Sequence, residues 1–433
     1  MNRIILIGNG FDLAHGLQTS YKDFIQGYHV YLKLKLLEDQ DGQSDGLCSI
    51  ALDNPDDRSR LEHFHWLLHD STTRFQRGWV NEMRFDEFNR FYDTLSIKYE
   101  NPFWSAINKC IESKNWVDIE TEYYLWLKRI FKQDNCGYTC PSRLNEDMKL
   151  ITSHLAGYLQ IIQTYFVKSD LVKDCIRKTI YEPFSARDIS VKGKELFLQF
   201  LKGRWDESQI EDKTARHIFS ANYGYSFDEM ERDITFHLHD VVTNWESHQD
   251  HLLKGKSVPD YYLLPDQVLL LNFNYTKMAD LYLPEGSAFQ VNHIHGELEN
   301  ENNPIIFGYG DELDEDYKTI SNLNDNAYLT NIKSIRYLET DNYRRLLSFV
   351  DSAPYQIYIM GHSCGNSDRT LLNTLFEHRN CVSIKPYYHL KEDGTDNYIE
   401  IIQNISRNFN DMQLMRDRVV NKSYCRPLVP AGA

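Results

Sequence analysis

Short apolar runs alternate with polar and helix-like segments at the two ends of the chain. Residues 4–7 form the first apolar run, which ends at a Gly-Asn-Gly turn where neither a strand nor a helix continues comfortably. Apolar runs return after residue 266 in the segments VLLLNFNY, FQVNHIHG, PIIFGYG, YQIYIMGHS and CVSIKPYY. Helix-like stretches lie between them, near 340–350, 368–379 and 396–408. Short apolar strands that alternate with helices predict a parallel, doubly wound sheet.

The part of the chain between these ends has a helical pattern. Ser20, followed by Asp23 three positions later, is typical of a helix start. Aromatic and aliphatic residues then recur at spacings of three and four in 116–133, 143–178 and 226–254. These stretches predict mainly helices, with few strands.

The pattern as a whole predicts an α/β fold with a large helical insertion. A Rossmann-like parallel sheet is expected from residues 1–37 and 265–420, and 38–264 are expected to form the mainly helical insertion. A polar stretch from 38 to 60 predicts a surface loop or linker, and the final RPLVPAGA predicts an unstructured tail.

Charge and hydropathy exclude two classes of partner. The chain has 47 Lys and Arg against 63 Asp and Glu, a net charge of −16, so general binding to nucleic acid or to an anionic membrane is not expected. No apolar stretch approaches the roughly 20 residues that span a bilayer. The first apolar run is also too short for a signal peptide. We therefore expect a cytoplasmic protein.

The first candidate motif is GNGFD at 8–12, between the first strand and the following helix. Glycines there allow the backbone to approach a phosphate, and the N–H groups of a helix start favour an anion. Leu13 stands where a dinucleotide fingerprint has its third glycine, so a plain tight turn is the alternative. Asp12 is costly beside a phosphate unless it binds a sugar hydroxyl or an amide.

The second motif, FNYT at 273–276, follows an apolar strand directly. This places Asn274 at the carboxyl edge of the sheet, where open α/β sheets bind ligands. The alternative is a side chain that caps the next helix, a role that Thr276 can also fill.

The third motif, HIHGEL at 293–298, has two histidines two residues apart, which face the same way on a strand. His293 and His295 are compatible with a metal site, although the spacing indicates no third ligand and we expect none. His295 precedes a glycine at a strand end, and its pKa near neutrality suits a general base. A hydrogen-bonded structural histidine is the third interpretation.

The fourth motif, GHSCGNSD at 361–368, ends another apolar strand. Gly361 allows a close approach, Ser363 offers a hydroxyl, and Asp368 can cap the next helix or bind ribose hydroxyls. The spacing also matches the G-x-S-x-G nucleophile elbow, which requires a later acid and histidine. Asp368 is too close in sequence to Ser363 to be that acid.

The fifth motif, WVDIE at 116–120, has Asp118 and Glu120 beside Trp116. Two carboxylates can position a sugar or a base. The alternative is the acidic first turn of a solvated helix.

Together these segments resemble the bacterial abortive-infection AbiH family over nearly the whole chain. The motifs that carry the resemblance occur in the family's order: IILIGNGFDLAHGLQTSYKDF, WVDIE, LNFNYT, HIHGEL, IIFGYGDE and IYIMGHSCGNSD. The resemblance implies a role in defence against phages.

The order GxG, N-Y-T, H-G, G-x-S is also similar, more distantly, to the sirtuin-like NAD-consuming fold. That resemblance implies that Asn274 lies beside the nicotinamide ribose and that His295 serves as the base. Departures are Phe11-Asp12 after the glycines and Thr276 in place of an acid, and the cysteines of the sirtuin zinc module are missing, which argues against protein deacylation. The remaining positions expected to contact NAD are Gly8, Asn9, Gly10, Phe11, Asp12, Thr276, Gly361, Ser363 and Asp368.

The resemblance implies hydrolysis of NAD to nicotinamide and ADP-ribose, with NAD as substrate or ligand and no permanent cofactor. Nicotinamide departs from a pyridinium, so the enzyme must mainly hold the ribose, stabilise oxocarbenium-like charge and deliver water. Two alternatives are a non-enzymatic nucleotide sensor or interaction module, and a serine- or metal-dependent hydrolase. A phage-derived trigger or partner protein and a second copy of the chain are the expected macromolecular partners.

Overall fold

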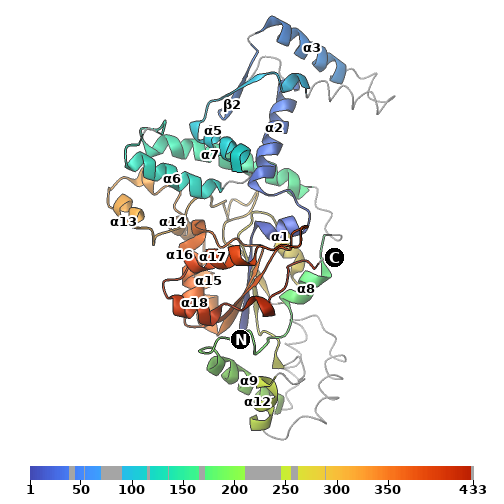
Figure 1. Ribbon diagram of the computed structural model, residues 1–433, viewed down its shortest axis with the longest axis vertical. Coiled ribbons are helices and arrows are strands. Elements are labelled where there is room, and N and C mark those ends of the chain that lie inside the picture. Colours follow the sequence, from blue (N-terminus) through green and yellow to red (C-terminus); the bar gives the residue numbers. More distant parts are fainter. Residues whose placement is uncertain are drawn as a thin grey trace. The chain divides into compact units, whose positions relative to one another are not determined.

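The computed structural model describes residues 1–38, 44–52, 54–69, 90–114, 118–134, 136–164, 171–209, 245–254, 262–287 and 289–430. The chain folds into two compact units (Figure 1). The first consists of Met1–Gln18, Ile162–Asn322 and Asn331–Ala433, and the second of Thr19–Ile161 and Leu323–Thr330. Among the described helices, none is long and apolar enough to cross a membrane.

A five-stranded parallel sheet forms the centre of the first unit, in the order β5-β4-β1-β6-β7. The strands are β1 (Asn2–Ile7), β4 (Val268–Asn272), β5 (Gln290–His293), β6 (Tyr355–Met360) and β7 (Cys381–Tyr387). Ile4 of β1 pairs with Leu269 of β4 on one side and with Ile357 of β6 on the other. The predicted α/β class is therefore confirmed, as is the pairing of the first strand with strands near the other end of the chain.

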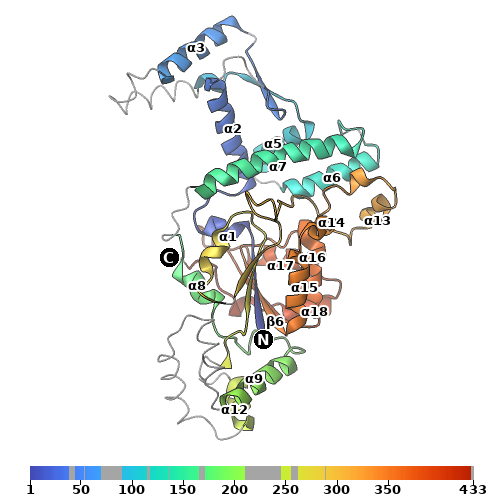
Figure 2. The same cartoon turned by 180° about the vertical axis from the view of Figure 1, so that it is seen from behind.

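Helices cover both faces of this sheet (Figure 2). The described helices of the first unit are α1 (Asn9–Ala14), α8 (Asp174–Ile180), α9 (Lys194–Gln209), α12 (Trp245–Leu253), α13 (Glu315–Ser321), α14 (Lys333–Arg336), α15 (Asn342–Ser352), α16 (Arg369–Glu377), α17 (Tyr398–Arg407) and α18 (Met412–Arg418). Short 3₁₀ helices are η2 (Met278–Tyr282), η4 (Tyr337–Glu339), η5 (Asn366–Asp368) and η6 (Lys422–Tyr424). The predicted helices near 340–350, 368–379 and 396–408 are confirmed by α15, α16 and α17.

Alternate side chains of β1 enter two different cores. Ile4 and Leu6 share a core with apolar residues of α15, α16, α17 and α18. Ile5 and Ile7 share the opposite core with residues of α1 and α8. A strand buried on both faces needs an uninterrupted apolar run, which explains the composition of β1.

The strand order places the site at the middle of the sheet. From β1 the chain winds through β4 to β5 on one side, and later through β6 to β7 on the other. Open α/β sheets bind ligands beyond the carboxyl ends of the strands where this winding reverses. The loops after β4, β1 and β6 meet at that point, and they contain three of the predicted motifs.

The second unit contains most of the predicted helical middle. Its helices are α2 (Tyr21–Glu38), α3 (Pro55–His69), α5 (Pro102–Lys114), α6 (Ile119–Phe131), α7 (Pro141–Thr164) and the 3₁₀ helix η3 (Asn326–Tyr328). The predicted helix start is confirmed, because the Ser20 amide donates to Asp23 and the Asp23 amide donates back to the Ser20 hydroxyl. The predicted helix 116–133 corresponds to α6, and 143–178 is divided between α7 and α8.

Three details of the predicted secondary structure were wrong. The polar stretch 38–60 is not only loop, since β2 (Cys48–Ala51) pairs antiparallel with β3 (Ser96–Tyr99). The segment PIIFGYG forms no strand and makes one isolated bridge, between Tyr309 and Ile332. The described part of the terminal segment, residues 426–430, is not an unstructured tail, because the Leu428 amide donates to the Tyr388 carbonyl just after β7.

The two units divide the chain differently from the predicted ranges. Helices α8, α9 and α12 belong to the unit that contains the sheet, and α2 belongs to the other unit. As limits of separate domains, the ranges 1–37 with 265–420 and 38–264 stay a prediction. Residues 226–244 of the third predicted helical stretch lie outside the described residues.

Candidate functional site

The glycine loops after β1 and β6 pack directly against each other. The amides of Gly8 and Gly10 donate to the carbonyls of Met360 and Gly361, and the Phe11 amide donates to Gly8. A Cβ on Gly10 would lie 2.9 Å from the Gly361 Cα. These three amides therefore already have protein acceptors. The tight-turn interpretation accounts for the glycines, and phosphate binding by Gly8, Asn9 and Gly10 stays a prediction.

Gly361 has the strongest requirement for glycine in this contact. Its φ is +77°, and a Cβ would lie 2.0 Å from the Phe11 backbone nitrogen. We expect Gly361→Ala to lower the free energy of unfolding by about 2–4 kcal/mol, the sum of left-handed strain and overpacking. The exposed Gly203 of α9, which has no atom within 4 Å of an added Cβ, is the matched control. Urea unfolding should show Gly203→Ala unchanged or about 0.5–1 kcal/mol more stable; equal effects at both sites would contradict this account.

Asp12 connects the loop after β1 to the loop after β4. Its side chain is buried, and Oδ1 accepts from Asn274 Nδ2 at 2.9 Å. Oδ2 accepts from the Thr276 hydroxyl at 2.6 Å. The Asn274 amide group also donates to the Gly8 carbonyl at 3.1 Å. The proposed capping roles of Asn274 and Thr276 were therefore wrong. Asp12 binds the side-chain amide of Asn274, and its contact with a ligand stays a prediction.

The surroundings of Asp12 make its carboxyl group sensitive to pH near neutrality. Burial raises its pKa to about 7, because desolvation outweighs the opposing hydrogen bonds from Thr276 and Asn274. A buried acid that titrates near neutral pH at the carboxyl edge of a sheet is typical of functional sites.

A second buried cluster surrounds Asp368, the last residue of η5. Lys333 Nζ lies 2.8 Å from Oδ1, and the Nε2 of His295 lies 3.1 Å from the same oxygen. The Nε2 of His362 lies 3.5 Å from Oδ2. The carboxylate of Asp368 makes no capping bond to α16, so the capping interpretation was wrong. Contact of Asp368 with a ribose stays a prediction.

The charges of this cluster determine the state of His295. Burial lowers the pKa of His295 to about 4, with a further contribution from Lys333, against the pull of Asp368. Burial alone would raise the pKa of Asp368, but Lys333 and His295 hold it well below its usual range. At neutral pH the cluster therefore contains a carboxylate, an ammonium group and a neutral imidazole.

The orientation of the His295 ring leaves one nitrogen for chemistry. Because the Asp368 carboxylate can only accept, the proton of the neutral ring lies on Nε2, which is also 3.1 Å from the Tyr337 hydroxyl. Within the described part of the chain, Nδ1 has no hydrogen-bond partner. The ring stacks on Tyr337, and Phe273 packs edge-on against His295 and His362. Since Asn274 follows Phe273 directly, the two buried clusters adjoin.

His293 does not share a site with His295. Strand β5 ends at His293. The Nε2 of His293 lies 3.1 Å from Asp280, and the side-chain amide of Asn272 lies beside the Nδ1 of His293. The two histidines therefore pair with different acids, and the expectation that one strand face presents both was wrong. Across the described ranges, no group of three or more His, Cys, Asp or Glu side chains has an arrangement that could hold a metal ion.

The serine of the fourth motif bonds to no base in the part of the chain that the structure describes. The Ser363 side chain is exposed, and its carbonyl accepts from Asn404. The nearest histidine of the motif, His362, accepts from the Cys364 amide through Nδ1. Among the described residues, no histidine bonds to the Ser363 hydroxyl, so the hydrolase interpretation gains no geometric support. The expected contact of Ser363 with NAD stays a prediction.

The fifth motif forms a helix start. Asp118 caps α6, and its Oδ1 accepts from the amides of Glu120 and Thr121 at 3.1 Å each. This confirms the helix-start interpretation for Asp118, whereas Glu120 is buried, so the expectation that this helix start is solvated was wrong for Glu120. Trp116 lies outside the described residues.

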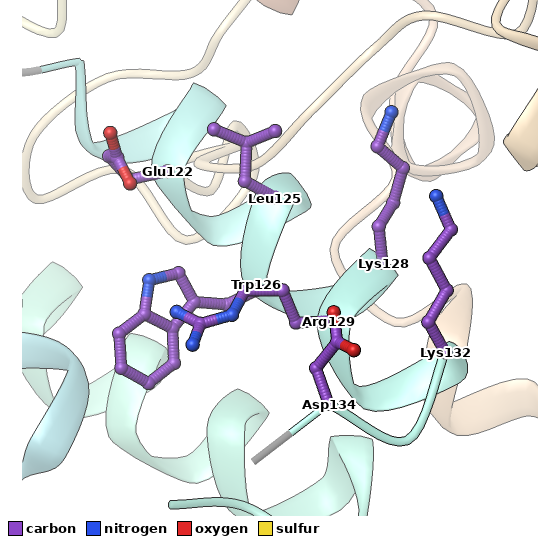
Figure 3. A pocket seen from close by; sticks show the side chains of 7 residues that line it. All are labelled: Glu122, Leu125, Trp126, Lys128, Arg129, Lys132 and Asp134. Carbon is purple, nitrogen blue, oxygen red and sulfur yellow. The ribbon is translucent and has the colours of Figure 1, made fainter. Parts of the chain in front are cut away.

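The hollow on α6 is open and belongs to the second unit (Figure 3). Figure 3 labels its lining residues: Glu122, Leu125, Trp126, Lys128, Arg129, Lys132 and Asp134. The Arg129 guanidinium lies 5.2 Å from the centre of the Trp126 ring, as expected for a packed cation–π pair.

Three members of the site were missed by sequence reasoning: Lys333, His362 and Tyr337. His362 lies inside the fourth motif, so its position after a buried strand was a usable signal. Lys333 and Tyr337 belong to short helical segments, where no periodic pattern distinguishes them from surface residues.

Comparison with known proteins identifies one family. The profile described as "Bacteriophage abortive infection AbiH" matches residues 4–389, which includes both loop clusters of the site. No curated protein and no solved structure matches the chain. The chain belongs to the bacteriophage abortive infection AbiH family.

Proposed function

We propose that this chain defends against phages by hydrolysing NAD to nicotinamide and ADP-ribose at the carboxyl edge of its sheet. The proposal is carried by one observation: two buried clusters of titratable groups lie side by side at the middle of the sheet, where the winding of the strands reverses. One contains Asp12 and Asn274, and the other contains His295 and Asp368. Membership of an abortive-infection family supports the role in defence.

The first cluster suits a ribose. Asp12 already accepts from an amide and a hydroxyl, and its raised pKa shows that the charged form lacks sufficient solvation. Hydroxyl groups of a bound ribose would supply further donors and favour the carboxylate. Asn274 is half-buried beside Asp12 and offers an amide at the same position. The two side chains would hold the sugar while positive charge develops on it.

The second cluster suits the activation of water. His295 is neutral at physiological pH, and Asp368 holds its proton on Nε2. The lone pair on Nδ1 would accept a proton from water as the water oxygen bonds to the ribose carbon. The bond between that carbon and the nicotinamide nitrogen breaks, its electron pair neutralises the pyridinium, and no acid is needed for the leaving group.

The raised pKa of Asp12 predicts a characteristic dependence of rate on pH. If the Asp12 carboxylate holds the ribose, kcat/KM for NAD should rise as pH increases through about 7. His295, with a pKa of about 4, stays neutral over this range and should add no step. The measurement is a pH–rate profile of the purified chain and of Asp12→Asn. A profile of Asp12→Asn with the same limb near neutrality would contradict the assignment.

Incubation of the purified full chain with NAD, followed by product analysis, tests the proposal. Nicotinamide and ADP-ribose should appear in equal amounts, with one proton released per turnover. NAD that binds without cleavage, even in lysates of phage-infected cells, would favour the sensor alternative. Cleavage that a chelator or Ser363→Ala abolishes would favour the metal- or serine-dependent alternative.

A further inference from the structure

Lys333 is the charged member of the site that no motif indicated. Its side chain is completely buried at the start of α14, and Nζ lies 2.8 Å from Asp368 Oδ1. The same oxygen lies 3.1 Å from the Nε2 of His295. Because the Lys333 ammonium group and the His295 ring share one buried carboxylate oxygen, the charge of Lys333 influences how Asp368 orients the His295 ring.

We propose, on the basis of the NAD-cleaving function above, that Lys333 is a positioning residue for His295. Its ammonium group keeps Asp368 charged inside the protein, and the charged Asp368 holds His295 with the proton on Nε2. Nδ1 then keeps its lone pair for water. Lys333 acts through Asp368 and does not contact the substrate.

The need for Lys333 follows from the cost of a buried charge. Without a counter-charge, a carboxylate in this environment is neutralised by a proton. Either Asp368 takes the proton and releases the His295 ring, or His295 takes it and loses the lone pair. Both outcomes remove the base that the proposed reaction needs.

The groups around His295 set the direction of the expected change. Asp368 favours the protonated ring, whereas Lys333 and His362 oppose it, and the Tyr337 hydroxyl lies beside Nε2. Removal of the Lys333 charge should therefore raise the pKa of His295. The expected rise is about 1–3 units, the range for a neighbouring charge.

The decisive measurement is a ¹⁵N NMR titration of the histidine rings in the full chain, with His295→Gln to assign the signals. The wild-type His295 ring should stay neutral and protonated on Nε2 from about pH 5 to about pH 8. Lys333→Met should raise its pKa, and Lys333→Arg should restore the wild-type titration. A His295 ring that titrates identically in wild type and Lys333→Met overturns the proposal.

A second variant covers a loss of folding. If Lys333→Met does not fold, the double variant Lys333→Met with Asp368→Asn removes both charges and should recover the melting temperature. Its His295 ring should lose the preference for a proton on Nε2, because the neutral amide no longer selects one tautomer. A ring that keeps this preference in the double variant would also overturn the proposal.

NAD turnover separates this proposal from the function on which it rests. Folded Lys333→Met should show kcat lowered about 10–100-fold with KM little changed, by analogy with the groups that orient metal-binding histidines and carboxylates from the outer shell. Lys333→Arg should recover most of kcat. A wild-type chain that never cleaves NAD refutes the proposed function, while the ring titration still decides the role of Lys333. A folded Lys333→Met with wild-type kcat and pH profile refutes the positioning role alone.

Discussion

Replacement of His295 by alanine is expected to lower the rate of NAD hydrolysis by about 10²–10⁴-fold, the usual contribution of a positioned general base. The imidazole is buried, neutral and held by Asp368, so its loss removes the acceptor for the proton of water. NAD affinity should change much less than kcat, because Asp12 and Asn274 would still hold the ribose. Product release and NAD binding should be measured on the same preparation.

The matched control is Ser363→Ala. Ser363 also follows a strand of the central sheet, β6, but its side chain is exposed and bonds to no histidine among the described residues. Turnover by Ser363→Ala should stay within a few-fold of wild type. A His295→Ala protein that keeps the wild-type melting temperature and turns NAD over at the wild-type rate would remove His295 from the mechanism.

The effect of Asp12→Asn on stability is expected to depend on pH. The free energy of unfolding of the variant, minus that of wild type, should be larger at about pH 8 than at about pH 4. In the folded chain the pKa of Asp12 is raised to about 7 from 3.8, so the folded state keeps a proton that the unfolded state has lost. The contribution of Asp12 to the free energy of unfolding of the wild type therefore falls as pH rises from about 4 to about 7. Above about pH 7 this contribution falls no further. Asparagine carries no such penalty. The difference in relative stability between the two pH values should be on the order of 4 kcal/mol.

Denaturant unfolding of both proteins at the two pH values gives this difference, and effects of the substitution that do not depend on pH cancel. Glu315→Gln, at an exposed position of α13, is the control and should show no comparable difference. A difference for Asp12→Asn equal to that of the control would show that Asp12 is not a buried carboxyl group of raised pKa.

Much of the sheet was predictable because apolar runs report burial on both faces. The runs around 4–7, 268–272, 355–360 and 381–387 all became strands. The segment PIIFGYG has the same apolar character but lacks ladder pairing, although Ile306 and Phe307 are buried. An apolar run indicates that a segment is buried in a core. Whether that segment pairs as a strand depends on which other strands lie beside it, and a local sequence pattern does not specify this.

The convergence of the motifs was predictable from parallel topology, but the roles of single residues were less so. Glycines after β1 would be needed whether a phosphate or another backbone segment packs against this loop. In the structure, the loop that contains Gly361 packs there. Lys333 was not predictable, since a single lysine in a short polar helix is normally exposed. Its burial depends on Asp368, 35 positions later in the chain.

The most direct test of the account is the concentration of NAD in bacteria that carry this chain during infection by a phage that it restricts. We predict that the concentration of NAD falls, and that those of nicotinamide and ADP-ribose rise, before the infected cells stop growing. Cells that carry His295→Ala or Asn274→Ala at wild-type protein abundance should keep their NAD and lose protection against the phage. Restriction of the phage by the wild-type chain with NAD unchanged would contradict the account.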